Sequence, residues 1–128
     1  MSFYSESAVK KTRKPHRCSG CDRPIETGSE ALRYSGVFDG YFASHIHHPE
    51  CRQAEIALNR LHDVRDGDDW MALTDMEADD WPWLLAEYPT IAERMGITAE
   101  KIRENEEESA RMRAFWIEQA KKRQESNR

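Results

Sequence analysis

Two short stretches, Cys18-Ser19-Gly20-Cys21 and His48-Pro49-Glu50-Cys51, decide the fold of this chain. Each stretch holds two potential metal ligands separated by two residues, and 26 residues lie between the two pairs. Zinc favours four sulfur or nitrogen ligands at the corners of a tetrahedron. A tight loop lets the first pair converge, and a helix that begins at His48 would place His48 and Cys51 on one face. Because four protein ligands leave no open position, we expect one structural zinc ion rather than a catalytic one.

The fourth ligand has alternatives in the sequence. His45 and His47 lie close to His48, but only His48 repeats the two-residue gap of the first pair. The set uses all three cysteines of the chain. Three unrelated buried cysteines near surface histidines are the other interpretation, and the two matched spacings favour the metal site.

The residues around these ligands resemble a known family. Arg23-Pro24-Ile25 and Gly28 follow the first pair, and Ser35-Gly36, Asp39-Gly40 and Phe42 precede the second. Over about residues 13–62 this pattern is similar to the treble-clef zinc fingers of small phage and prophage proteins, many of which have Cys at the position of His48. The resemblance implies a knuckle, a β-hairpin and a helix around one structural zinc ion. It implies no activity, because the functions of that family are largely unassigned.

Composition and charge limit the size of the core and the class of protein. The chain has 128 residues, enough for one domain or for a small domain with helical appendages, but its hydrophobic fraction is 38% and its charged fraction 34%. A metal cross-link is a common supplement to so small a core. The net charge is −5, with residues 1–65 slightly basic and residues 66–128 strongly acidic. Because no apolar run reaches the ~20 residues of a membrane span and no signal-peptide core is visible, we expect a cytoplasmic protein.

The chain divides into four predicted segments of an α+β protein. They are a flexible basic arm over 1–15, a treble-clef zinc-binding domain over 16–65, an acidic Trp-rich helical segment over 66–97, and a long C-terminal helix over 98–128. Within the zinc-binding domain, residues 31–34 and 41–47 are predicted to form a hairpin. Its turn would lie at Asp39-Gly40 or, nearly as well, at Ser35-Gly36.

Cap and breaker residues predict where the helices begin. One helix should begin at His48, with Pro49 at its first position. A second should follow the capping-box match Thr74–Glu77. The last should begin after the N-cap Thr98 and run to about residue 124.

Basic side chains are concentrated before the first cysteine. They are Lys10, Lys11, Arg13, Lys14 and Arg17. Such clusters neutralise phosphate groups, so the arm and the finger are predicted to engage nucleic acid. A solvated tail that happens to be basic is the alternative.

Two further regions suggest protein partners. One is an acidic cluster around three tryptophans, made of Asp66, Asp68, Asp69, Asp75, Glu77, Asp79 and Asp80 with Trp70, Trp81 and Trp83. This cluster could bind a host protein, as an interaction module or host-factor inhibitor, or its tryptophans could be ordinary core. The other is the stripe Met112, Trp116 and Ala120 with Phe115 beside it, which would support a homodimer or pack back on residues 81–95.

The residues of a His-Asn-His nuclease have candidates in His45, His47, Asn59 and His62, but their spacing fits that family poorly. Neither a phosphate-binding Gly-rich loop nor a serine-nucleophile motif is present in the sequence. We therefore expect a binding protein rather than an enzyme, with nuclease activity as the least favoured reading.

Overall fold

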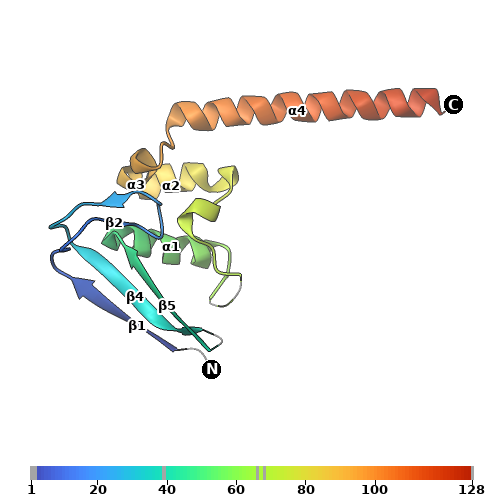
Figure 1. Ribbon diagram of the computed structural model, residues 1–128. Helices are drawn as coiled ribbons and strands as arrows, with labels where there is room; N and C mark the ends of the chain where they lie inside the picture. The colour runs from blue at the N-terminus through green and yellow to red at the C-terminus, as the bar shows by residue number, and fades with distance from the viewer. Residues whose placement is uncertain (1–2, 39, 66, 68, 128) are drawn as a thin grey trace.

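The computed structural model describes residues 3–38, 40–65, 67 and 69–127 and shows a mixed α and β fold (Figure 1). Its strands are β1 (Phe3–Val9), β2 (His16–Arg17), β3 (Pro24–Ile25), β4 (Ala31–Phe38) and β5 (Tyr41–His47). Its helices are α1 (Pro49–Leu61), α2 (Trp81–Glu87), α3 (Pro89–Arg94) and α4 (Ala99–Ser126), with 3-10 turns η1 (Leu73–Asp75) and η2 (Ala78–Asp80) before α2. None of the described helices is both long and apolar enough to cross a membrane.

The main sheet is antiparallel, with β4 between β1 and β5. The predicted hairpin is confirmed, but β4 continues through Ser35-Gly36 to Phe38, which pairs with Tyr41. The strands therefore end at Phe38 and begin again at Tyr41. Of the predicted turn residues, Asp39 lies outside the described residues. Gly40 has a φ of +83°, which glycine adopts without steric cost.

The prediction of a flexible arm over residues 1–15 is wrong for residues 3–9, because these form the edge strand β1 along β4. Their sequence alternates, so that Tyr4 and Glu6 share one face of the strand. The Tyr4 ring lies 4.8 Å from the Tyr34 ring, and Glu6 accepts a 2.7 Å hydrogen bond from Arg52. Long-range partners thus order a segment that has little apolar surface of its own.

Helix α1 begins where the sequence predicts, with His48 as its N-cap and Pro49 in its first turn. Its buried face carries Cys51, Ala54 and Leu58 and packs against β4 and β5. Helix α1 follows β5 directly, and the loop that joins β2 to β3 packs against the end of β5. The first turn of α1 therefore lies beside that loop. Ser19 in that loop donates to the carbonyl at the end of β5, that of Ile46, at 2.8 Å.

Residues 69–97 complete the core. Leu73, Leu84 and Ile91 are buried and join Leu58 in one apolar cluster. The predicted capping box is wrong, since Thr74 lies inside η1 and α2 begins at Trp81. Pro82 has no N–H group, so an α-helix running on from residue 74 would lack one of its hydrogen bonds.

Helix α4 begins at its predicted cap, where the Thr98 hydroxyl accepts the N–H of Lys101 at 3.1 Å. The helix has 28 residues, or about 42 Å at 1.5 Å per residue. It contacts α2 near its start and then extends past the rest of the molecule, as Figure 1 shows. We call residues 3–97 the body.

Candidate metal centre

The first pair of cysteines lies in the tight loop between β2 and β3. The Cys18 N–H donates to the Arg23 carbonyl at 2.9 Å, which closes the loop. Glycine suits the tip, because a Cβ at Gly20 would lie 3.2 Å from the His47 ring and 3.3 Å from the Cβ of Cys51. The loop can therefore rest directly against the end of β5 and the first turn of α1.

The structure brings Cys18, Cys21, His48 and Cys51 together, with their ligand atoms all within 4.8 Å of one another. The Nδ1 atom of His48 lies 3.5 Å from the sulfur of Cys21 and 3.7 Å from that of Cys51. In a zinc tetrahedron, bonds of about 2.3 Å to sulfur and about 2.0 Å to nitrogen put neighbouring S and N atoms about 3.5 Å apart. The four side chains can therefore hold one metal ion, and they are the residues predicted from the sequence.

His48 is oriented by a hydrogen bond on the far side of its ring. Its Nε2 atom lies 3.1 Å from the Pro24 carbonyl oxygen. Because a carbonyl only accepts, Nε2 carries the proton and Nδ1 presents its lone pair to the sulfurs. The other two candidates face elsewhere: His45 is exposed on β5, and the buried His47 has Nε2 3.6 Å from the Glu55 carboxylate.

The surroundings of the three sulfurs favour negative charge, but not three charges without a cation. The N–H groups of Gly20 and His48 donate to the Cys18 sulfur at 3.3 and 3.4 Å. Hydrogen bonds from Cys18 and Cys51 lower the pKa of the Cys21 thiol, whereas the hydrogen bonds with Cys18 and Cys21 raise the pKa of Cys51. The site thus stabilises the thiolate of Cys21 but disfavours loss of a proton from Cys51 beside it. A divalent cation at the centre would remove that opposition.

Arg94, at the end of α3, belongs to the same site and was not predicted. It donates to the Cys51 sulfur at 3.3 Å and to the Glu50 carboxylate. Burial raises the pKa of Glu50, but the hydrogen bond from Arg94, a backbone hydrogen bond and the Arg94 charge together outweigh it and leave that pKa below its usual value. No ligand spacing connects residues 51 and 94. The available signal was that Arg94 is the single Lys or Arg among residues 66–100.

The predicted nucleic-acid residues lie in and beside the loop between β1 and β2. Four are exposed and make no ion pair among the described residues: Lys10, Lys11, Arg13 and Lys14. The fifth, Arg17, pairs with Asp22 at 3.2 Å. Thr12 anchors the loop, because its buried hydroxyl donates to the Glu26 carbonyl at 2.8 Å and accepts the Gly28 N–H at 3.0 Å. The basic side chains are therefore carried on a fixed loop.

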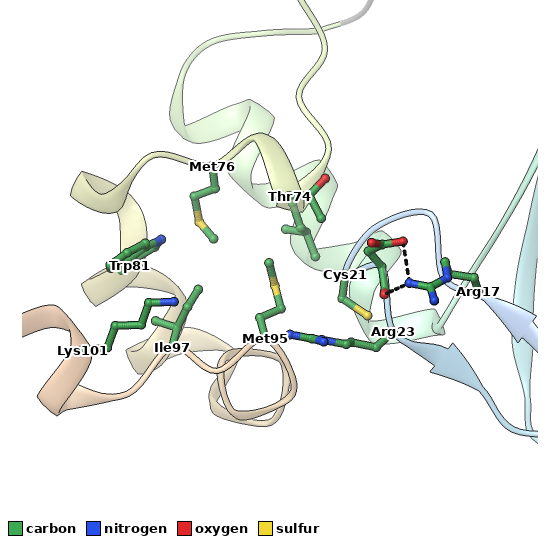
Figure 2. A pocket seen from close by; sticks show the side chains of 11 residues that line it. Arg17, Cys21, Arg23, Thr74, Met76, Trp81, Met95, Ile97 and Lys101 are labelled. Atoms are coloured by element: carbon green, nitrogen blue, oxygen red, sulfur yellow. Dashed lines mark hydrogen bonds and ion pairs between the residues drawn. The ribbon is translucent and has the colours of Figure 1, made fainter. Parts of the chain in front are cut away.

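A pocket of about 310 Å³ lies next to the cluster of three cysteines and His48. Figure 2 shows Met76 and Met95 pointing into it from opposite sides. Lys101 lies at one end, with its Nζ atom 5.0 Å from the centre of the Trp81 ring. Cys21 lines the other end, so the cluster forms part of the pocket wall.

The nuclease candidates have separate roles in the structure. Asn59 is buried, and its side chain accepts the Met71 N–H at 2.8 Å and donates to the Met71 carbonyl at 2.9 Å. His62 lies 2.7 Å from Asp80. Within the described part of the chain, the Cys and His set above is the one metal-binding group of three or more such residues. That the protein is not an enzyme stays a prediction.

The tryptophans of the acidic segment pack inward. Trp81 and Trp83 lie against the apolar core, and Trp70 donates to the Glu55 carboxylate at 3.0 Å. The acidic residues predicted around them include Asp66 and Asp68, which lie outside the described residues. At Trp81 and Trp83, the structure supports the core interpretation over the interface.

Comparisons with protein-family models, with curated proteins and with solved structures find no match to this chain. Its function therefore has to be argued from the site.

Proposed function

We propose that this protein is a treble-clef zinc finger whose single zinc ion is structural. The convergence of three sulfurs and one imidazole nitrogen within 4.8 Å carries the proposal. The order of the elements supports it, since a knuckle between β2 and β3, the β4–β5 hairpin and then α1 supply the ligands. No protein group other than these four is needed to complete a tetrahedron, so the ion would have no open position for substrate.

Replacement of zinc by cobalt tests the ligand set directly. A tetrahedral site with three thiolates and one histidine should give intense sulfur-to-cobalt absorption at one cobalt per chain. His48→Ala should weaken cobalt binding and change the spectrum, whereas His45→Ala, at an exposed position on β5, should leave both unchanged. A binding ratio far below one ion per chain would contradict the proposed zinc site.

We further propose that the finger engages nucleic acid through Lys10, Lys11, Arg13, Lys14 and Arg17. Because its motifs resemble those of phage and prophage proteins, we propose that it does so in the cytoplasm of a host cell. The support is physical. The first four residues have no carboxylate partner among the described residues, so their charge is available to phosphates. Thr12 fixes their loop on the finger, which lowers the ordering cost of binding.

The experiment compares binding to a 20-base-pair DNA duplex and to single strands of DNA and RNA of that length over a range of salt concentrations. Changing Lys10, Lys11, Arg13 and Lys14 together to Gln should weaken binding and flatten the salt dependence, because up to four phosphate contacts are lost. The matched control changes four exposed bases elsewhere to Gln: Arg60, Arg65, Arg103 and Lys121. Equal effects of the two variants would show that net charge, and not this loop, determines binding.

The alternative, protein binding by the acidic Trp-rich segment, has weaker support. Trp81 and Trp83 pack against the core, so their rings contribute less to an exposed surface than an interface of aromatic anchors requires.

A further inference from the structure

The second half of α4 has no covering partner among the residues that the structure describes. From Ala110 to Asn127 every residue except Gln119 is exposed. The exposed residues include four large apolar side chains: Met112 at 48%, Phe115 at 51%, Trp116 at 56% and Ile117 at 57% of their full accessibility. We call residues 110–126 the free half of α4.

The apolar face of the free half continues the face by which α4 rests on the body. Ile102, Asn105 and Ser109 are half-buried near the start of the helix. At 3.6 residues per turn, Met112 and Trp116 follow them on the same side, and Phe115 lies beside that stripe. Whatever covers Met112 and Trp116 would extend an existing packing surface.

Charge divides the helix into two parts of opposite sign. Residues 99–110 carry five acids and two bases: Glu100, Glu104, Glu106, Glu107 and Glu108 with Lys101 and Arg103. Residues 111–126 carry five bases and two acids: Arg111, Arg113, Lys121, Lys122 and Arg123 with Glu118 and Glu125. The net charges are therefore −3 and +3. A second copy of the same helix complements this pattern when it runs in the opposite direction.

We propose that the free half of α4 binds a second copy of this chain as an antiparallel helix pair, with the two-fold axis near Phe115. In that arrangement residue 108 lies opposite residue 122 of the other copy, since each is seven residues, or about 10 Å, from the axis. Residues separated by two heptads also occupy the same flank of the helix. Glu108 thus faces Lys122, and this pair occurs twice by symmetry.

A parallel pair would lose these contacts. It would place the acidic residues 99–110 of one helix beside those of the other, and the basic residues 111–126 likewise, and it would align the two helix dipoles. Electrostatics therefore selects the direction, while Met112, Phe115 and Trp116 supply the apolar area. The inference is independent of the proposed zinc and nucleic-acid functions.

The test is sedimentation equilibrium of the full metal-loaded chain at up to about 100 μM, where a complex of roughly micromolar Kd is mostly associated. We expect a monomer–dimer equilibrium for the wild type. The double variant Phe115→Ser, Trp116→Ser should be monomeric while it keeps the metal content and the helical circular dichroism of the wild type. A monomeric wild type would overturn the proposal.

Charge reversal tests the direction. Glu108→Lys and Lys122→Glu should each raise the dimer Kd roughly ten-fold, because two attractive pairs become repulsive. The double variant with both changes should return to the wild-type Kd. Lys121→Glu, which points to the opposite face of the helix, is the matched control and should change the Kd little. In a parallel dimer residues 108 and 122 would lie about 21 Å apart along the helix axis, so the second change could not compensate the first. A Kd that stays raised in the double variant would overturn the antiparallel arrangement.

Discussion

In the body, residues far apart in the sequence hold one another: Arg52 binds Glu6, Arg94 binds Cys51, and Met71 is bound on both its N–H and its carbonyl by Asn59. In the free half of α4 the backbone is ordered by hydrogen bonds between residues four apart, as in any α-helix. The first kind of order is cooperative and can be lost as a unit. The second is local and frays from the end.

The composition of its core also shows why the body would gain stability from a metal ion. Its buried apolar side chains include few large ones, among them Ile25, Leu58, Leu73, Leu84 and Ile91. Three further members of that core are the ligand cysteines, whose burial is favourable only if their charge is balanced. Small cores of this kind are commonly completed by a metal cross-link.

Removal of the metal should have the largest effect of any single change. Structural zinc sites contribute about 10–16 kcal/mol at neutral pH, which exceeds the stability of about 5–15 kcal/mol of a typical domain. We expect a strong chelator to unfold the body, and acidification to do the same, because protons compete with the metal for the thiolates and the imidazole. Hydrogen exchange of amides in β4, β5 and α1 measures this.

The control is the same sample after zinc is restored, which should recover the slow exchange. If those amides stay protected once the metal has been removed, the apolar core alone holds the body together and the metal is not what makes its order cooperative.

The next effect is that of a cavity in the core. Leu84, in α2, is fully buried and belongs to the apolar cluster that joins α2 and α3 to α1. Leu84→Ala should cost about 2–5 kcal/mol of unfolding free energy. The measurement is denaturant unfolding of the metal-loaded protein. Leu61→Ala, at an exposed position near the end of α1, is the matched control and should cost far less.

Some features of the structure could be predicted from the sequence and others could not. The ligand set, the start of α1 at His48 and the cap at Thr98 follow local rules, in which a residue and its near neighbours determine the geometry. The strand β1 and the role of Arg94 do not. They depend on Arg52 and Cys51, partners more than 40 positions away, which no spacing rule connects.

The capping-box error has the same origin. Thr74 and Glu77 satisfy a local pattern, but Leu73 is drawn into the core and Pro82 delays the helix until Trp81. Tertiary packing therefore overrode a local signal. The charge division of α4 can be read from the sequence, but its significance depends on the exposure of Met112, Phe115 and Trp116, which the structure shows.

Loss of Arg94 should have a smaller effect that is specific to the metal site. Arg94→Met keeps much of the apolar stem but removes the donor to the Cys51 sulfur and the charge that offsets the excess negative charge of three thiolates around zinc. Outer partners of metal ligands typically change metal affinity by about 10–100-fold. Competition with a chromophoric zinc chelator measures this, and Arg103→Met on the exposed side of α4 is the control. An unchanged affinity would make Arg94 a packing residue that binds Glu50.

The smallest expected effect separates the two regions most cleanly. The Thr98 hydroxyl accepts the Lys101 N–H at the first turn of α4 and touches nothing in the metal site. Thr98→Ala should cost about 1 kcal/mol of local helix stability, and Thr98→Ser, which keeps the oxygen, should cost much less. Hydrogen exchange in residues 101–104 should rise for Ala alone, while metal affinity and exchange in α1 stay at the wild-type level. Since α4 touches the body mainly at α2, a change that spread to α1 would mean that the helix and the metal-centred body unfold together.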